Sequence, residues 1–85
     1  MIYNRKVVIV TGGASGLGQI TCQELAKKGA KIVAFDLNEV AGEALVDSLS
    51  SPALFVKVNV TDEASVAAGI KQAVDTFGAI HACIN

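Results

Sequence analysis

The chain has 85 residues, of which 52% are hydrophobic and 18% charged, and its formal net charge is -1. This composition is typical of one small globular domain and excludes a disordered chain. The near-neutral charge gives no electrostatic reason to expect nucleic acid as a partner. No apolar run approaches the roughly 20 residues of a membrane span, so no membrane partner is expected either. Cys22 and Cys83 lack CxxC spacing. Both are expected to be buried, reduced thiols in the cytoplasm.

The spacing of apolar residues predicts strands that alternate with helices. Short β-branched runs are typical of buried parallel strands, and an apolar residue at every third or fourth position is typical of a helix packed on a sheet. Strands joined by helices imply right-handed crossovers and a parallel sheet, with 3-2-1-4 as the expected order. The predicted fold class is α/β, a Rossmann-like three-layer βαβαβαβ unit that is incomplete relative to a full doubly wound domain. The expected strands are 6–11, 31–36, 54–58 and 80–84, and the expected helices are 16–28, 38–49 and 61–78.

Individual residues predict where the helices begin, end and face the sheet. Gly29 can take the left-handed conformation that follows a helix, and Gly78 ends the third helix. Asn38 is expected to cap the second helix and Thr61 the third. The apolar faces are expected at Leu17, Ile20 and Leu25, then at Ala41, Leu45 and Leu49, and finally at Val66, Ile70, Val74 and Phe77.

A glycine-rich turn, TGGASGLG at residues 11–18, lies between the first strand and the first helix. Gly12 can turn the chain sharply because it tolerates positive φ. At Gly16 a side chain would stand between the backbone and an approaching phosphate, and Gly18 is expected to let the helix pack closely on the strand. The N–H groups of the first helical turn and the helix dipole both favour an anion there. The turn, with the Ser15 hydroxyl as a helix cap or phosphate donor, predicts a site for the pyrophosphate of a dinucleotide.

Asp36 ends the second strand, 18 residues after Gly18. A carboxylate at this place can accept hydrogen bonds from both hydroxyls of the adenosine ribose, and it would repel the 2′-phosphate of NADP. Two unit charges about 4 Å apart interact by about 4 kcal/mol at an effective dielectric constant of 20. No Arg or Lys stands at positions 13, 14, 37 or 38 to reverse this preference. The predicted cofactor is therefore NAD.

These features resemble the short-chain dehydrogenase/reductase family. The resemblance is carried by TGGASGLG, which matches the family pattern TGxxxGxG in full, by Asp36 after an apolar strand, by NVTD at 59–62 and by Asn85. It covers the chain from the first strand to the last but only the front part of the family's catalytic domain. It implies that residues 1–85 are the N-terminal part of a Rossmann dinucleotide-binding domain. The implied enzyme transfers hydride between NAD and a secondary alcohol or ketone, and its full-length form is a homo-oligomer.

The resemblance also implies roles for single residues. Many relatives have Asp where this chain has Asn59, which implies weakened selectivity for adenine. TGGASGLG with Phe35-Asp36-Leu37 is similar to members that act on 3-hydroxyacyl-CoA or hydroxysteroids. The implied cofactor-binding residues are Gly12, Ser15, Gly16, Leu17 and Gly18 at the pyrophosphate and nicotinamide, Asp36 and Leu37 at the ribose, Asn59 and Val60 at the adenine, and Asn85 at the end of the last strand.

The residues for the family's proton transfer, a Tyr and Lys in YxxxK and an upstream Ser, are not matched here. The only tyrosine is Tyr3, and Val7 stands four positions later, so no catalytic residue is expected in this chain. The small-molecule substrate would bind to segments beyond it. His81 has no companion ligands and is expected to face solvent or lie at an edge, so no metal site is predicted.

Two other interpretations remain open: a stand-alone nucleotide-binding module without catalysis, and a truncated, inactive chain that persists by associating with another subunit. The strand at 80–84 is apolar and would form an exposed sheet edge. Such an edge invites mispairing, so the isolated chain is expected to be marginally stable or to self-associate.

Overall fold

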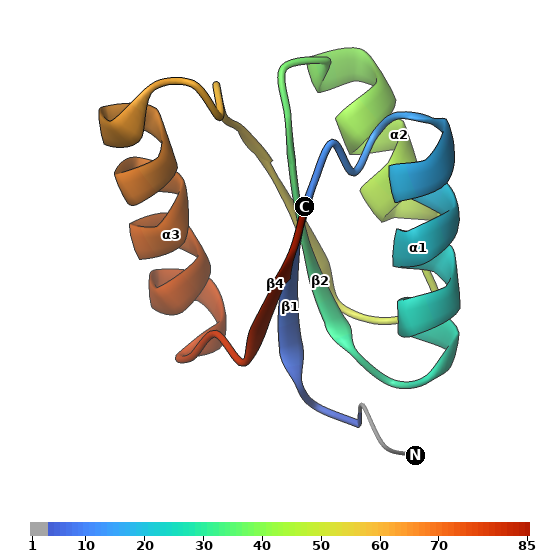
Figure 1. Cartoon of the computed structure of the whole chain (residues 1–85). Helices are drawn as coiled ribbons and strands as arrows, with labels where there is room; N and C mark the ends of the chain where they lie inside the picture. Colours follow the sequence, from blue (N-terminus) through green and yellow to red (C-terminus); the bar gives the residue numbers. More distant parts are fainter. Residues whose placement is uncertain (1–3) are drawn as a thin grey trace.

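The computed structural model describes residues 4–85. Tyr3, which the sequence makes the only candidate for the YxxxK tyrosine, lies outside the described residues. Strands and helices alternate along the chain as predicted, and most predicted bounds agree within one or two residues (Figure 1). The elements are β1 (Val7–Thr11), α1 (Gly16–Lys27), β2 (Lys31–Asp36), α2 (Glu39–Ser48), β3 (Ala53–Lys57), α3 (Glu63–Phe77) and β4 (Ala82–Ile84).

The four strands form one parallel sheet in the order β3-β2-β1-β4, which confirms the predicted topology. β1 lies between β2 and β4, and its Ile9 is in register with Val33 on one side and Cys83 on the other. Helices α1 and α2 cover one face of the sheet and α3 covers the other (Figure 1). The three-layer Rossmann-like architecture is thereby confirmed. The carboxyl ends of β1 and β4 meet where the strand order reverses, which is where ligands bind in open sheets of this kind.

The core has two parts because successive side chains of β1 and β2 point to opposite faces of the sheet. Val8 and Ile32 pack with Cys22 and Leu45 under α1 and α2. Val33 and its neighbours on the other face pack with residues of α3. Both faces of the two central strands are covered, which explains why their sequences are apolar without alternation.

The buried face of α3 differs from the predicted one. Its fully covered residues are Gly69 and Ala73, whereas Ile70 and Val74 are each 41% exposed. A Cβ added at Gly69 would lie 2.7 Å from Val58 Cγ2, so a small residue is what allows the helix to come this close. The apolar spacing found the correct side of the helix but missed the small residues at its centre.

The first helix also buries fewer of its apolar residues than predicted. Leu17 is 80% and Ile20 56% exposed, and burial begins at Cys22. Leu17 and Ile20 are not part of the core cluster under α1 and α2. Leu25 is buried as predicted.

Three of the four predicted helix ends are confirmed. Asn38 Oδ1 accepts from the Ala41 N–H at 3.0 Å, and Gly29 and Gly78 have φ of 91° and 85°. The predicted cap at Thr61 is wrong: Asp62 is the N-cap of α3. The reason is that the Thr61 hydroxyl is used elsewhere, since it donates to Asn59 Oδ1 at 2.7 Å.

The two cysteines differ in environment. Cys22 is buried, as predicted, and burial raises its pKa from 9.0 to about 11. The prediction of burial is wrong for Cys83, which is exposed. Cys83 lies on β4, where only β1 pairs with the strand among residues 4–85. This exposed edge is the one expected to promote self-association, which stays a prediction. None of the helices in the described part of the chain is long and apolar enough to cross a membrane.

Candidate functional site

Two hollows open side by side at the carboxyl ends of the strands, and Gly12 lines both. The one lined by Asp36, of about 240 Å³, is here called the Asp36 hollow. The one lined by Ser15, of about 370 Å³, is called the Ser15 hollow. Nine of the ten predicted cofactor-binding residues line one or both hollows, and Gly16 lines neither. Gly12, Asp36, Leu37, Asn59 and Val60 line the Asp36 hollow, and Gly12, Ser15, Leu17, Gly18 and Asn85 line the Ser15 hollow.

The glycine turn is held against β2 by its backbone. The N–H groups of Gly12 and Gly13 donate to the Phe35 carbonyl oxygen at 2.8 and 3.3 Å. Gly12 has φ of 67°, which confirms the predicted sharp turn. Ser15 occupies the N-cap position of α1, but its hydroxyl caps no N–H group and instead donates to the Gly12 carbonyl oxygen at 2.8 Å. The turn is therefore stiffened by its own hydrogen bonds.

The structure reassigns one glycine of the turn. A Cβ at Gly18 would overlap the Gly12 carbonyl oxygen, so Gly18 permits the turn to fold back on itself. The close approach to the sheet predicted for Gly18 belongs to Gly13, where a Cβ would lie 2.9 Å from Ala34 Cβ. A Cβ at Gly16 would meet nothing within 4 Å. Packing therefore gives no reason for a glycine at position 16, and the space beside it is open.

The beginning of α1 offers unpaired donors beside this open space. Within residues 4–85, the N–H groups of Gly16, Leu17 and Gly18 make no hydrogen bond to the protein. Such N–H groups, together with the helix dipole, favour an anion. No acidic side chain lies in the first turn of α1 to compete with it.

The Asp36 carboxylate joins two segments that flank the hollow. Oδ2 accepts from the Ala14 N–H of the glycine turn at 3.1 Å, and Oδ1 accepts from the Asn38 N–H at 3.0 Å. An ionised carboxylate has about four acceptor positions, so about two remain for further donors such as ribose hydroxyls. The link to Ala14 was not predicted, since the two residues are 22 positions apart.

Asn59 and Thr61 form a tight turn at the far side of the Asp36 hollow. Asn59 Oδ1 accepts from both the N–H and the hydroxyl of Thr61, at 3.0 and 2.7 Å. The Asn59 N–H donates to Ser65 Oγ at 2.9 Å. Both bonding positions of the amide oxygen are thus used within the protein.

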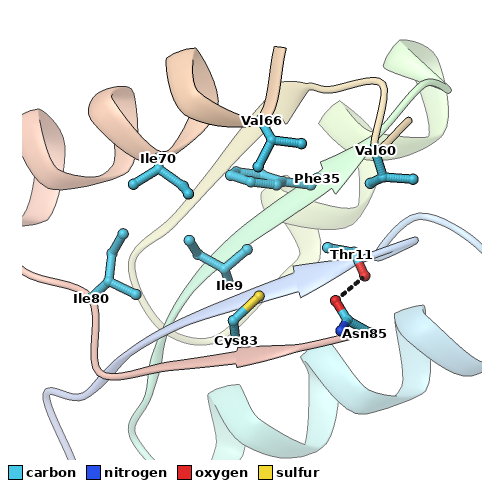
Figure 2. A pocket seen from close by; sticks show the side chains of 9 residues that line it. All are labelled: Ile9, Thr11, Phe35, Val60, Val66, Ile70, Ile80, Cys83 and Asn85. Carbon is cyan, nitrogen blue, oxygen red and sulfur yellow. Dashed lines mark hydrogen bonds between the residues drawn. The ribbon is translucent and has the colours of Figure 1, made fainter. Parts of the chain in front are cut away.

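Thr11 is a site residue that the sequence reasoning missed. Its hydroxyl lies 3.3 Å from both the Ile84 carbonyl oxygen and Asn85 Oδ1, so it ties the end of β1 to the end of β4 (Figure 2). As the first residue of TGxxxGxG at the end of a strand, it could have been found from the motif. Behind it lies an apolar groove of about 430 Å³, lined mainly by side chains of the sheet and α3 (Figure 2).

His81 lies near the opposite end of the sheet. Its side chain is exposed, as predicted, and Nδ1 accepts from the Val7 N–H at 2.9 Å, an interaction that was not predicted. The His81 N–H also donates to the Val7 carbonyl oxygen, at 2.9 Å. Among residues 4–85, no three His, Cys, Asp or Glu side chains are grouped as a metal site would require.

A parallel sheet of order 3-2-1-4, a glycine turn before the first helix and an acid after the second strand define a Rossmann-like α/β unit. The family model described as short chain dehydrogenase matches residues 6–85. The chain belongs to the short-chain dehydrogenase family.

Known relatives are much longer than this chain. It is 42% identical over its whole length to the 3-hydroxyacyl-CoA dehydrogenase type-2 of Drosophila melanogaster, of which it covers 33%. It is 35% identical over 80 residues to a 3-alpha-(or 20-beta)-hydroxysteroid dehydrogenase of Mycobacterium bovis, covering 94% of this chain and 31% of the relative. The chain therefore spans about a third of the length of these relatives.

Two solved structures have the same fold. They are the 3-ketoacyl-(acyl-carrier-protein) reductase from Brucella melitensis complexed with NADH and an NAD+-bound xylitol dehydrogenase. Each is 31% identical to this chain with a TM-score of 0.90. The similarity covers 94% and 98% of this chain, respectively, and 33% of each solved chain.

Proposed function

We propose that residues 1–85 are the N-terminal, NAD-binding part of an oxidoreductase that transfers hydride between NAD and a secondary alcohol or ketone. The observation that carries this proposal is the open space at Gly16 beside unpaired N–H groups, next to a hollow that holds Asp36. The two similar solved structures contain NADH and NAD+, which supports the same cofactor here.

The proposed cofactor position follows the two hollows from end to end. The pyrophosphate lies at the start of α1 against Gly16, Leu17 and Gly18, where the free N–H groups are. The adenosine ribose faces Asp36 and Leu37, with the adenine toward Asn59 and Val60. The nicotinamide end occupies the Ser15 hollow, which Asn85 closes.

When bound, NAD supplies the acceptor for a hydride. The role proposed for this chain is to bind and orient it. The preorganised backbone of the glycine turn receives the charged pyrophosphate, and the Asp36 carboxylate receives the ribose hydroxyls. The proton transfer is assigned to residues outside this chain, because Tyr3 is its only tyrosine and no YxxxK pattern is present. The similarity to the Drosophila and Mycobacterium proteins supports a 3-hydroxyacyl-CoA or a hydroxysteroid as substrate of the whole protein, which we propose to be a homo-oligomer.

The test is a calorimetric titration of the folded chain with NAD and with NADP. We expect NAD to bind at least tenfold more tightly, because about 1.4 kcal/mol suffices for a factor of ten and charge repulsion at Asp36 exceeds this value. Asp36→Ala should reduce the preference. Absence of NAD binding to a folded chain would exclude the proposal, and an unchanged preference in Asp36→Ala would exclude the ribose assignment.

A further inference from the structure

The backbone N–H groups of residues 12–18 fall into two sets. Within residues 4–85, those of residues 12–15 donate to protein acceptors and those of residues 16–18 do not. In the first set one acceptor is a side chain, because the Ala14 N–H donates to Asp36 Oδ2 at 3.1 Å. The other acceptors are the backbone carbonyl oxygens of Phe35 and Gly12. Asp36 therefore holds the residue that lies two positions before the first free N–H group.

The carboxylate of Asp36 is itself held in place by its surroundings. The Asp36 carbonyl oxygen accepts from the Val58 N–H at 3.1 Å, which ties this residue to the end of β3. Its Oδ1 accepts from the Asn38 N–H at 3.0 Å, just before α2 begins. The sheet and the start of α2 thus fix the acceptor, and the acceptor in turn fixes the position of Ala14.

The two bonds of the carboxylate differ in burial. The bond from Ala14 is partly buried, whereas the bond from Asn38 is exposed. A donor that loses its acceptor costs more free energy when water cannot take the acceptor's place. A side chain at position 36 with a single acceptor oxygen should therefore serve the Ala14 N–H, while water serves the Asn38 N–H.

The charge of Asp36 acts against an anion at the start of α1, since like charges repel. If charge were its only effect on the phosphate, removal of the carboxylate would strengthen the binding of an anion at residues 16–18. If the bond to Ala14 holds the free N–H groups in place, removal of that bond would weaken the binding. The two effects have opposite signs, so they can be separated by experiment.

We infer that Asp36 is a positioning residue for the pyrophosphate, in addition to its proposed contact with the ribose. By holding Ala14, its carboxylate fixes the place at which the turn ends and the free N–H groups of Gly16, Leu17 and Gly18 begin. The inference rests on the proposed function, which places the pyrophosphate at these groups. One carboxylate then serves both the ribose end and the phosphate end of the site.

The test uses inorganic pyrophosphate, which has no ribose and so cannot report the ribose contact. The amide signals of Gly16, Leu17 and Gly18 are followed by NMR at constant ionic strength while pyrophosphate is added to Asp36→Ala and to Asp36→Asn. The two variants lose the same charge, but Asp36→Asn keeps an acceptor for the Ala14 N–H. We expect the dissociation constant of Asp36→Ala to be about five- to 30-fold higher than that of Asp36→Asn. This fold-change corresponds to the ordering of one backbone residue.

Asp36→Asn should bind pyrophosphate at least as tightly as the unaltered chain, because it keeps the bond to Ala14 and lacks the charge. Asp36→Val is the second variant without an acceptor, and its β-branched side chain suits the end of a strand. It should bind as weakly as Asp36→Ala, and it replaces that variant if Asp36→Ala does not fold. Each titration is made on a folded chain, so a lower free energy of unfolding alone leaves the dissociation constant unchanged.

The outcomes separate this inference from the proposed function. If pyrophosphate shifts none of the three amide signals in the unaltered chain, the proposed phosphate position fails and the inference fails with it. If pyrophosphate binds and the variants without an acceptor have the same dissociation constant as Asp36→Asn, only the inference is overturned. Tighter binding by Asp36→Ala or Asp36→Val than by Asp36→Asn also overturns it, because the bond to Ala14 would then contribute nothing to the phosphate site.

Discussion

Replacing Gly16 by alanine should separate cofactor binding from folding. Among the glycines of residues 12–18, Gly16 is the one at which a Cβ meets nothing within 4 Å. It is also the first residue of α1, where alanine is at least as favourable as glycine. In a helix interior, alanine stabilises the helix by up to about 1 kcal/mol relative to glycine. The free energy of unfolding of Gly16→Ala should therefore be unchanged or raised by at most about this amount.

The same methyl group should weaken NAD binding. It would stand between the free N–H groups at the start of α1 and the pyrophosphate, and so remove the contact with the positive end of the helix. Such a contact is worth about 0.3–1 kcal/mol at an exposed site and up to about 2 when partly buried. The dissociation constant of NAD should thus rise by between about twofold and about 30-fold, before any direct overlap with the phosphate is added.

The assay combines urea unfolding with NAD titration on the same preparations. Gly18→Ala is the matched control, since the same methyl group two residues later would overlap the Gly12 carbonyl oxygen. It should lower the free energy of unfolding by about 1–3 kcal/mol, the usual range for overpacking. A Gly16→Ala chain that binds NAD with unchanged affinity would refute the proposed phosphate position. A lower free energy of unfolding for Gly16→Ala would refute the conclusion that the space around Gly16 is open to a Cβ.

Three further predictions concern stability and reactivity. His81→Ala should lower the free energy of unfolding by about 1–3 kcal/mol, because it leaves the Val7 N–H of β1 without its acceptor. His81→Asn keeps an oxygen in the place of Nδ1 and should retain most of that free energy. Equal losses for the two variants in urea unfolding would exclude His81 as the acceptor that stabilises β1. Gly42→Ala should lower the free energy of unfolding by about 1–3 kcal/mol, although alanine has the better helix propensity, because the added Cβ would overlap the Phe55 ring. A gain in the free energy of unfolding would contradict the close contact between Gly42 and Phe55. Burial raises the pKa of Cys22 to about 11, so a thiol reagent at pH 8 should modify Cys83 alone until the chain is denatured. The stability that this shift confers is fully present below pH 9.0 and is lost as the pH rises through about 11, and Cys22→Ala should remove that alkaline loss.

The sequence by itself was enough to predict the order of elements, the parallel 3-2-1-4 sheet and nine of the residues that line the two hollows. Four of the nine, Leu37, Asn59, Val60 and Asn85, came from the family resemblance. These features depend on signals that act over short stretches of chain. The β-branched runs, the apolar residues at helical spacing and the glycines of residues 11–18 each act within a single element or turn. Asp36 is found in the same way, because it ends an apolar strand and parallel strands bring their carboxyl ends to one edge of the sheet.

The tertiary structure alone decided how closely those elements approach and which polar groups meet. Apolar spacing shows which side of a helix can face the sheet, but the space left by Val58 and the neighbouring aromatic ring places Gly69 at the contact. The bond from Ala14 to Asp36 spans 22 residues and that from Val7 to His81 spans 74. Such pairs depend on the packing of the layers rather than on neighbours in the chain, so no local pattern could indicate them.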